Sequence, residues 1–338
     1  MPAIATHELT KEYAVGFWRS RRYRALDRLN LEVEAGEVFG FLGPNGAGKT
    51  TTLKLLMQLV FPTSGGAEML GRPLGDLSVK RRLGYLPENP YFYDHLTAQE
   101  LLEYFAALFG YPGGECRARA SRLLDEVGIG AERRLQLRKF SKGMLQRVGI
   151  AQALVNDPEL VIFDEPMSGL DPLGRRDVRA LILRLRDRGC TVFFSSHVLS
   201  DAEALCSRVA ILARGRLVAS GRLSEMHPFR ASGWELVVAG AGDQVIAALG
   251  PRVRRAVRLG EGRFMLDLPL EPPPERLLGE LTAGGAHLVS LNPIRQTLED
   301  FFVEQVTTPE VASTKRGLES GGGTEGPPYE DRKAAARR

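Results

Sequence analysis

The sequence predicts an α/β protein in which a mostly parallel core sheet carries a helical insertion and a small α+β domain follows. From residue 1 to about residue 228, short apolar runs alternate with amphipathic stretches, as strands and helices do in α/β domains. The runs at 159–166 and 191–197 are almost continuously apolar, which is typical of strands buried on both faces of a parallel sheet. The pattern changes after about residue 228 and indicates a second, smaller domain.

Length and composition describe an ordinary globular chain. Its 338 residues suffice for one large and one small domain, and 43% of them are hydrophobic and 25% charged. No apolar run approaches the roughly 18 residues of a membrane span, and residues 1–13 lack a secretion signal, so we expect the chain to stay inside the cell. Three cysteines without a CxxC pair argue against a disulfide framework and a zinc site. A net charge of +4 suits an anionic small ligand or a membrane face and is weak evidence for nucleic acid.

The large domain is assigned to residues 1–228, and its first core strand is expected at 37–43. The residues after this strand read as a helix over 51–60, whose apolar face consists of Leu53, Leu56, Met57 and Val60. A further strand is expected at 82–87, immediately before the helical insertion.

Helix signals dominate from Leu96 to about Ala153. A capping box at 97–100 predicts a helix start, because a Thr and a Glu three positions later can each bond a backbone N–H of the other. Gly110 and Gly128 are typical of helix stops. We therefore expect a helical subdomain over about 89–153, inserted into the sheet domain.

The small domain is assigned to residues 229–306. Its apolar segments can be read in the order β-α-β-β-α-β, which describes a ferredoxin-like unit, and a helical stretch at 296–306 follows. From Thr307 the chain is rich in Gly, Pro, Ser and charge, which cannot bury enough surface to become ordered. Residues 307–338 are therefore expected to form a disordered tail.

A phosphate-binding loop is the first motif that carries chemistry. The segment GPNGAGKTT matches G-x-x-x-x-G-K-[ST] and lies where this loop must lie, after a strand and at the start of a helix. Backbone N–H groups and the helix dipole favour phosphate there, Lys49 reaches the β- and γ-phosphates, and the Thr50 hydroxyl ligates Mg²⁺. The expected nucleotide-binding residues are Gly43, Pro44, Asn45, Gly46, Ala47, Gly48, Lys49, Thr50 and Thr51.

An acidic pair closes the apolar strand at 159–166. Asp164 is placed to hold the water shell of Mg²⁺, and Glu165 is placed to accept a proton from the water that attacks the γ-phosphate. The alternative is an ordinary strand-end turn with two acids. The phosphate loop favours the catalytic interpretation.

A third motif links the first two. Ser141, Lys142 and Gly143 open an amphipathic helix, which alone would be a helix cap. Between a phosphate loop and an acidic strand, the segment resembles the signature motif of ATP-binding cassette (ABC) proteins, usually written LSGGQ. Residues 168–172, which include Asp171, resemble the D-loop of that family, and His197 resembles its switch histidine. The resemblance covers residues 1 to about 228 and uses several independent motifs in the family's order.

The resemblance implies a P-loop NTPase of the ABC cassette type that binds ATP and Mg²⁺ and hydrolyses ATP as a pair of cassettes. In that family, Ser141 and Gly143 of one cassette would cap the γ-phosphate held by Lys49 of the other. His197 would bond the γ-phosphate and position the water, acting with Glu165 and Lys49; a buried core histidine is the alternative. Tyr13 lies where the family stacks an aromatic ring on adenine. The alternatives are that Tyr13 is an aromatic residue of the core and that Tyr23 takes this role.

Two features depart from the family pattern. In the signature segment, defined as residues 140–144, Lys142 and Met144 replace a Gly and a Gln, so Lys142 can add a charge contact while any contact of the Gln is lost. Glu88 stands where most members carry the Q-loop glutamine. A carboxylate can ligate Mg²⁺ at least as well as an amide, because hard cations prefer charged oxygen. A solvent-facing turn residue is the alternative for Glu88.

A cassette with a small α+β domain and no membrane span resembles the separate ATP-binding subunit of ABC-2-type exporters, and residues 297–302 are similar to the closing segment of such subunits. The resemblance implies a homodimer that drives export through a separately encoded multi-span permease, in the cytoplasm at the inner face of the membrane. The alternative is a soluble cassette ATPase acting on DNA or the ribosome. The segment between Lys49 and Ser141 is too short for a long coiled coil and the chain has one cassette, so direct nucleic-acid binding is not expected.

Overall fold

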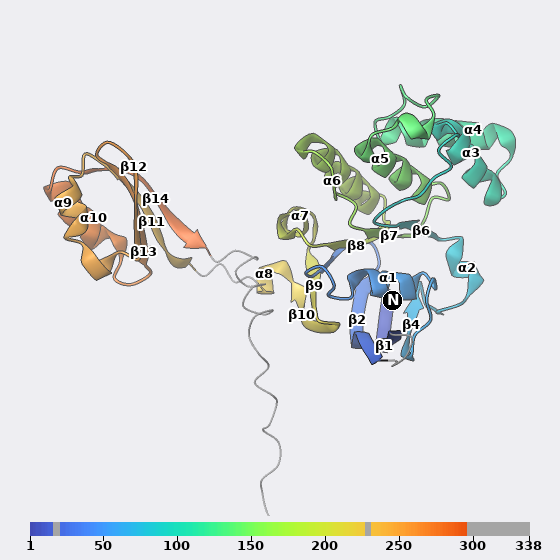
Figure 1. The fold of residues 1–338 in the computed structure, drawn as a ribbon, viewed down its shortest axis with the longest axis horizontal. Coiled ribbons are helices and arrows are strands. Elements are labelled where there is room, and N and C mark those ends of the chain that lie inside the picture. Colours follow the sequence, from blue (N-terminus) through green and yellow to red (C-terminus); the bar gives the residue numbers. More distant parts are fainter. Residues whose placement is uncertain (16–20, 227–230, 296–338) are drawn as a thin grey trace, which may run out of the picture. The chain divides into compact units, whose positions relative to one another are not determined.

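The computed structural model describes residues 1–15, 21–226 and 231–295 (Figure 1). The larger part, up to residue 226, and the smaller part, residues 231–295, are described separately below. In the described residues of the larger part, the strands form two sheets. The first is a six-stranded core sheet with the order β10-β9-β3-β8-β7-β6. It comprises β3 (Val38–Leu42), β6 (Leu83–Leu86), β7 (Leu160–Asp164), β8 (Thr191–Ser196), β9 (Arg208–Ala213) and β10 (Arg216–Arg222).

The core sheet is parallel except at one edge, where β10 pairs antiparallel with β9, and this confirms the predicted mostly parallel sheet. Every residue of β3, β7 and β8 is buried. Layers on both faces cover these strands, which explains why their sequences are continuously apolar instead of alternating.

An antiparallel sheet with the order β2-β1-β4-β5 was not predicted from the sequence. Its strands are β1 (Pro2–Val15), β2 (Arg21–Glu34), β4 (Ser64–Met69) and β5 (Arg72–Pro73). The β1–β2 pairing contains four register shifts, so neither strand keeps a regular apolar alternation. The helix α1 (Lys49–Leu56) contacts β2 of this sheet and β7 of the core sheet, and one hydrophobic core includes side chains from all three.

The helix predicted over 51–60 extends beyond the observed end of α1. The helix stops at Leu56 with Met57 as its cap, and Gln58 follows with φ 56°, a left-handed conformation that breaks the helix. Val60 therefore lies beyond the helix. It still packs with Met57 against the core that the helix covers, so the apolar pattern was read correctly as burial and wrongly as helix.

The predicted helical insertion contains α3 (Ala98–Leu108), α4 (Gly113–Glu126), a short 3₁₀ turn η1 (Leu137–Lys139) and α5 (Lys142–Ala153). The capping box is confirmed, because the Thr97 N–H donates to Glu100 Oε2 at 2.8 Å and the Glu100 N–H donates to Thr97 Oγ1 at 3.2 Å. Gly110 and Gly128 follow the ends of α3 and α4 with φ of 90° and 74°, as predicted helix stops should.

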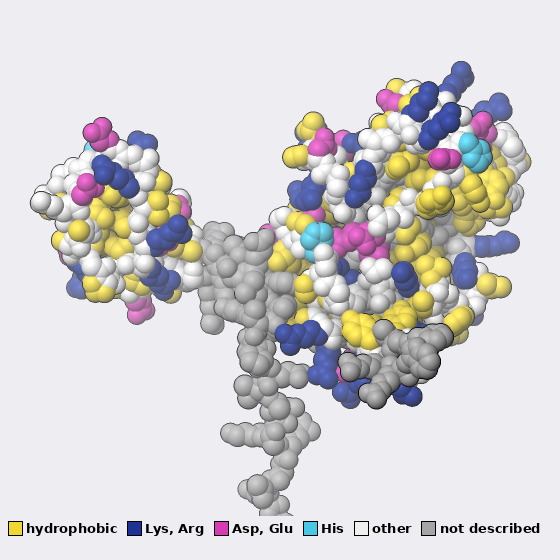
Figure 2. Space-filling model, viewed as in Figure 1, with side chains coloured by type: hydrophobic (Ala, Val, Ile, Leu, Met, Phe, Trp, Pro, Cys, Tyr) yellow, Lys and Arg dark blue, Asp and Glu magenta, His cyan; other side chains and the backbone are white. Residues whose placement is uncertain are grey.

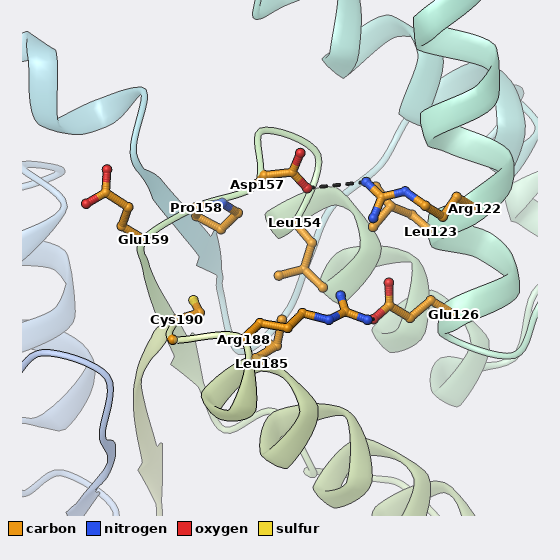
Figure 3. Close-up of a pocket in the computed structure, with 11 residues that line it drawn as sticks. Arg122, Leu123, Glu126, Leu154, Asp157, Pro158, Glu159, Leu185, Arg188 and Cys190 are labelled. Carbon is orange, nitrogen blue, oxygen red and sulfur yellow. Dashed lines mark hydrogen bonds and ion pairs between the residues drawn. The ribbon is translucent and has the colours of Figure 1, made fainter.

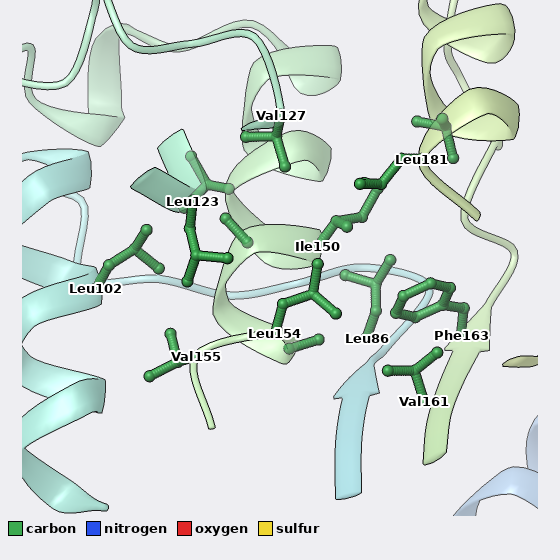
Figure 4. Close-up of a cluster of buried hydrophobic side chains, with 14 of the residues drawn as sticks. Leu86, Leu102, Leu123, Val127, Ile150, Leu154, Val155, Val161, Phe163 and Leu181 are labelled. Carbon is green, nitrogen blue, oxygen red and sulfur yellow. The ribbon is translucent and has the colours of Figure 1, made fainter. Parts of the chain in front are cut away.

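One continuous core joins the insertion to the sheet. Figure 4 shows Leu102, Leu123 and Ile150 from the insertion together with Leu86 and Phe163 from β6 and β7. Further helices are α2 (Leu77–Lys80), α6 (Pro172–Asp187), α7 (Leu199–Leu205) and α8 (Leu223–Met226). Because the insertion shares its core with β7, it is mechanically linked to the strand that carries the acidic pair.

The smaller part has the predicted β-α-β-β-α-β order. Its elements are β11 (Ala231–Ala239), α9 (Asp243–Ala247), η2 (Gly250–Arg252), β12 (Arg255–Gly260), β13 (Arg263–Pro269), α10 (Pro274–Ala283) and β14 (His287–Arg295). They form an antiparallel sheet with the order β12-β13-β11-β14 and a hydrophobic core of their own. The helix expected at 296–306 and the tail expected at 307–338 lie outside the described residues. Across the described ranges, no helix combines the length and the apolar character that a membrane span requires.

Candidate active site

The phosphate loop connects β3 to α1, as the sequence predicted, and its backbone needs glycine. Gly48 has φ 109°, and a Cβ at this position would lie 2.5 Å from the Ala25 carbonyl oxygen. A Cβ at Gly43 would lie 2.4 Å from the carbonyl oxygen of Leu212. Any larger residue at either position would push the loop away from the strands that hold it.

Lys49 points back into the loop. Its ammonium donates to the carbonyl oxygen of Gly43 at 2.7 Å and to that of Pro44 at 3.4 Å, and only 6% of the side chain is exposed. It also lies 3.4 Å from Glu165 Oε1. A positive charge is thus held beside the N-terminus of α1, where an anionic group is favoured by the helix dipole and the free N–H groups.

Asp164 ends β7 beside Thr50. The Thr50 hydroxyl lies 3.4 Å from Asp164 Oδ1, and the Ser195 hydroxyl donates to the same oxygen at 2.6 Å. Burial raises the pKa of Asp164, and the nearby carboxylates of Glu88 and Glu165 raise it further. A divalent cation at this position would offset the cost of holding the carboxylate ionised.

Ser195 was missed by sequence reasoning. Besides donating to Asp164, its hydroxyl accepts the backbone N–H of Glu165 at 2.9 Å, so it sets the relative position of both acids. The available signal was the pair of serines that ends the apolar run of β8. Buried polar side chains on a core strand must find partners, and here the partner is the acidic pair.

Glu165 and His197 meet at the carboxyl edge of the sheet. His197 Nδ1 lies 2.9 Å from Glu165 Oε2, while the other Glu165 oxygen faces Lys49. Glu165 has φ 51°, an uncommon conformation for a residue other than Gly, directly after the end of β7. The structure therefore brings together the predicted lysine, acid and histidine.

Tyr13 and Tyr23 both lie at this site. They are directly opposite each other in the β1–β2 pairing, and they line one cavity of about 440 Å³ together with the phosphate loop, Glu88, Glu165 and His197. The structure thus leaves both aromatic side chains available to the base of a nucleotide, and the choice between them stays a prediction.

Glu88 follows β6 and lines the same cavity. It lies close enough to Asp164 for its charge to raise the pKa of that carboxyl group. No group of three or more His, Cys, Asp or Glu side chains that could hold a metal is found in the described residues. Mg²⁺ usually combines one or two carboxylates with phosphate oxygens and water, and Asp164 and Glu88 would supply such carboxylates beside the phosphate loop.

The signature segment lies elsewhere. Ser141 caps α5 by accepting the Met144 N–H at 3.2 Å, and Asp171 caps α6 by accepting the Gly174 N–H at 2.7 Å. Ser141, Gly143 and Asp171 line a second cavity of about 490 Å³, whose lining contains no residue of the phosphate loop. Within one chain, the structure therefore does not bring Ser141, Gly143 and Asp171 together with Lys49.

The two departures in the signature segment have different surroundings. Met144 packs against the hydrophobic core of the helical insertion. The Lys142 side chain is exposed and crosses Gly169, where an added Cβ would lie 2.9 Å from the ammonium nitrogen. Lys142 is thus the residue that carries charge into this second cavity from the signature segment.

A third cavity, of about 270 Å³, lies at the amino ends of β7 and β8, opposite the carboxyl ends where the acidic pair lies (Figure 3). Glu159 and Cys190 precede the amino ends of β7 and β8 there, whereas Asp164 ends β7 and Glu165 and His197 follow the carboxyl ends. Arg122 bridges to Asp157 at 3.2 Å, and burial raises the pKa of the Cys190 thiol to about 11. Cys190 is thus a buried thiol that is rarely ionised, and the lining of this cavity contains none of the predicted site residues.

A strand, a glycine-dependent phosphate loop, a helix with its lysine turned inward and an acidic pair on a neighbouring strand define a P-loop nucleoside triphosphatase. Comparisons with known proteins narrow this class. The family model described as ABC transporter matches residues 26–168.

An uncharacterized ABC transporter ATP-binding protein of Synechocystis sp. is 45% identical over 305 residues, which cover 90% of this chain and 84% of the relative. The bacitracin transport ATP-binding protein BcrA of Bacillus licheniformis is 42% identical over 218 residues, which cover 64% of this chain and 68% of BcrA. The solved dimeric, post-hydrolysis structure of the ATP-binding cassette MJ0796, bound to ADP and Pi, has a TM-score of 0.61 at 27% identity and covers 65% of this chain. The chain therefore belongs to the ABC transporter ATP-binding proteins, and it is an ATPase of the cassette type.

The raised pKa of Asp164 predicts a pH-dependent effect of Asp164→Asn on stability. Because the folded-state pKa lies above the ordinary value of 3.8, the protonated form stabilises the fold at low pH, and this contribution is lost as pH rises through the folded pKa. Asparagine stays uncharged, so the variant should melt above the wild type in the absence of nucleotide and Mg²⁺, by a larger margin at about pH 7 than at about pH 4. Thermal melting at both pH values measures this. Asp187→Asn, at an exposed site, is the control, and an equal margin at both pH values would contradict the prediction.

Proposed function

We propose that this chain is the ATP-binding and ATP-hydrolysing subunit of an exporter, that it works as a homodimer, and that it drives a separate multi-span permease. The observation that carries the pairing is the separation of the signature segment from the phosphate loop within one chain. If Ser141 and Gly143 cap a γ-phosphate, that phosphate must be held by Lys49 of a second chain. The dimeric state of the similar MJ0796 cassette supports this arrangement.

Each site residue has a proposed role. Glu165 is the general base, His197 positions the water and contacts the γ-phosphate, and Lys49 neutralises charge on the β- and γ-phosphates. Thr50, Asp164 and Glu88 would hold Mg²⁺, which would supply positive charge beside the phosphates. Residues 43–51 bind the triphosphate, Tyr13 or Tyr23 stacks on adenine, and Ser141, Gly143 and Asp171 complete the site from the partner cassette.

An exposed apolar surface supports the permease partner. Figure 2 shows hydrophobic side chains gathered around α3, and the exposed large hydrophobic residues of this surface are Tyr91, Tyr93, Tyr104, Leu108 and Phe109. The rings of Tyr93 and Tyr104 meet edge to face at 6.4 Å. Exposed aromatic clusters of this kind are enriched at protein interfaces. We define these five residues as the aromatic surface and propose that it contacts the permease at the cytoplasmic side of the membrane.

Export as the direction of transport rests on relatives. BcrA is named as a bacitracin transport protein, and a relative that is 32% identical over 284 residues is the linearmycin resistance ATP-binding protein LnrL of Bacillus subtilis. These names favour export over action on DNA or the ribosome. We also propose the division into a cassette at 1–228, with a helical subdomain at about 89–153, and an accessory domain at 229–306.

Glu165→Gln tests the catalytic assignment. Without a base for the attacking water, kcat should fall by roughly 10²–10⁴, while ATP stays bound and traps the dimer. Phosphate release and size-exclusion chromatography with ATP measure the two effects. Glu159→Gln, at an exposed residue directly before the same strand, is the matched control. Undiminished hydrolysis by Glu165→Gln would remove Glu165 from the role of base.

Glu88→Gln tests the proposed metal contact. Loss of the carboxylate should raise the Mg²⁺ concentration for half-maximal ATPase activity and strengthen ATP binding in the absence of Mg²⁺, because one negative charge near the γ-phosphate is removed. Both shifts should be several-fold, and titration of Mg²⁺ with and without chelator measures them. Glu68→Gln, an exposed residue of β4, is the control. An unchanged Mg²⁺ dependence would leave Glu88 as a turn residue.

The aromatic surface is tested by Tyr93→Ser combined with Tyr104→Ser. Purification of the tagged wild-type chain from membranes should recover a hydrophobic multi-span protein, and the double variant should lose most of it while the isolated chain keeps its ATPase activity. Leu259→Ser, an exposed substitution on β12, should keep the partner. Consistent recovery of ribosomes or DNA with the wild type would instead support the competing function.

A further inference from the structure

The helix α7 carries a buried carboxylate that the proposed chemistry does not use. Asp201 is 1% exposed, and it lies on the first turn of the helix that begins directly after His197 and Val198. Both of its oxygens face arginines of the neighbouring helix α6. Arg179 Nη2 donates to Oδ1 at 2.5 Å, and Arg175 Nη1 lies 3.8 Å from Oδ2.

The two arginines connect Asp201 to the segment that resembles the D-loop. The Arg175 N–H donates to the Asp171 carbonyl oxygen at 2.9 Å in the first turn of α6, and Arg179 lies one turn further along. At the other end of this segment, the Ser168 N–H donates to the Glu165 carbonyl oxygen at 3.1 Å. The D-loop segment is therefore held between Glu165 and α6, the helix whose arginines pair with Asp201.

These contacts form a closed ring around Glu165. Glu165 contacts His197, and the chain leads from His197 to Asp201 on α7. The ion pair joins Asp201 to α6, and residues 168–171 lead from the start of α6 back to Glu165. Figure 1 shows α6 and α7 as neighbours beside β8. The Asp201 ion pair is the charged contact that closes this ring between the two helices.

The ion pair is better suited to fixing geometry than to adding stability. The Asp201 side chain is 2% exposed and that of Arg179 is 33% exposed, so the carboxylate bears most of the desolvation penalty of this contact, and that penalty offsets much of its attraction to the arginine. The Arg179 Nε is also buried and has no hydrogen-bond partner in the part of the chain that the structure describes, which is a further cost of this orientation. A directional contact retained at such a cost constrains how α7 sits against α6.

We propose that Asp201 is a positioning residue. It fixes α7 to α6, so that the contact of His197 with Glu165 depends on the position of the D-loop segment. The inference rests on the proposed roles of Glu165 and His197. Through this contact, a displacement of residues 168–172 by the partner cassette moves the switch histidine as well. Hydrolysis in one site is thereby made sensitive to closure of the dimer.

Asp201→Asn tests the proposal in the full chain. The variant keeps the size of the side chain and removes its charge, so kcat should fall by at least about tenfold because His197 is misplaced. The KM for ATP should stay within about twofold, since Asp201 touches none of the proposed nucleotide ligands. Asp187→Asn, an exposed residue at the end of α6 that pairs with its neighbour Arg186, is the matched control and should leave kcat unchanged.

A second substitution separates positioning from folding. Arg179→Lys keeps the charge and loses the directed contact, and it should also lower kcat with little change in KM. The double variant should be no slower than Asp201→Asn alone, because both changes break one contact. Melting curves for every variant show whether it is folded at the assay temperature. If Asp201→Asn does not fold, Arg179→Lys decides the question.

Two results would overturn the inference. The first is that Asp201→Asn folds and keeps the wild-type kcat. If Asp201→Asn does not fold, the same result for a folded Arg179→Lys would overturn the inference. The other is a rise in KM with kcat unchanged. Glu165→Gln, measured beside them, separates this failure from failure of the proposed function. An inactive Glu165→Gln with a fully active Asp201→Asn defeats only the positioning role, whereas an active Glu165→Gln defeats the assigned base and the inference that depends on it.

Discussion

The burial of α1 between two sheets is the constraint on which the site depends. Leu53, Leu55 and Leu56 are fully buried, and each contributes roughly 1.5–3 kcal/mol relative to an exposed position. This packing fixes the start of the helix, and the loop before it has to turn within the few residues left after β3. The carbonyl oxygens of Gly43 and Pro44 then receive the Lys49 ammonium. The position of the phosphate loop is thus set by apolar contacts on the far side of the helix.

The other face of the core sheet packs against the helical insertion. There, the helical insertion shares one core with β6, β7 and α6 (Figure 4). A shift of the insertion is resisted by close packing and passes to β7, whose last residue is Asp164. The sheet therefore separates a face that holds the phosphate loop from a face that links the site to the insertion.

Local motifs made much of the fold and the site predictable from sequence. The phosphate loop, the capping box at Thr97 and the acidic pair depend on residues that are close in the chain, so their geometry is encoded within a few positions. The antiparallel sheet was missed because four register shifts interrupt the β1–β2 pairing. Ser195 was missed because its importance comes from contacts with Asp164 and Glu165 across a neighbouring strand. Tyr13 and Tyr23 could not be separated for a similar reason, since the pairing of β1 with β2 places both at one cavity.

Under the proposed pairing, the separation of the signature segment from the phosphate loop makes ATPase activity depend on whether two chains are assembled. Each catalytic centre is then bimolecular, so the activity per chain of a dilute subunit depends on its concentration. Two copies held on one permease experience a much higher effective concentration than two copies in free solution. Unassembled subunits would consume little ATP, and turnover would be confined to complexes in which a transport path is present.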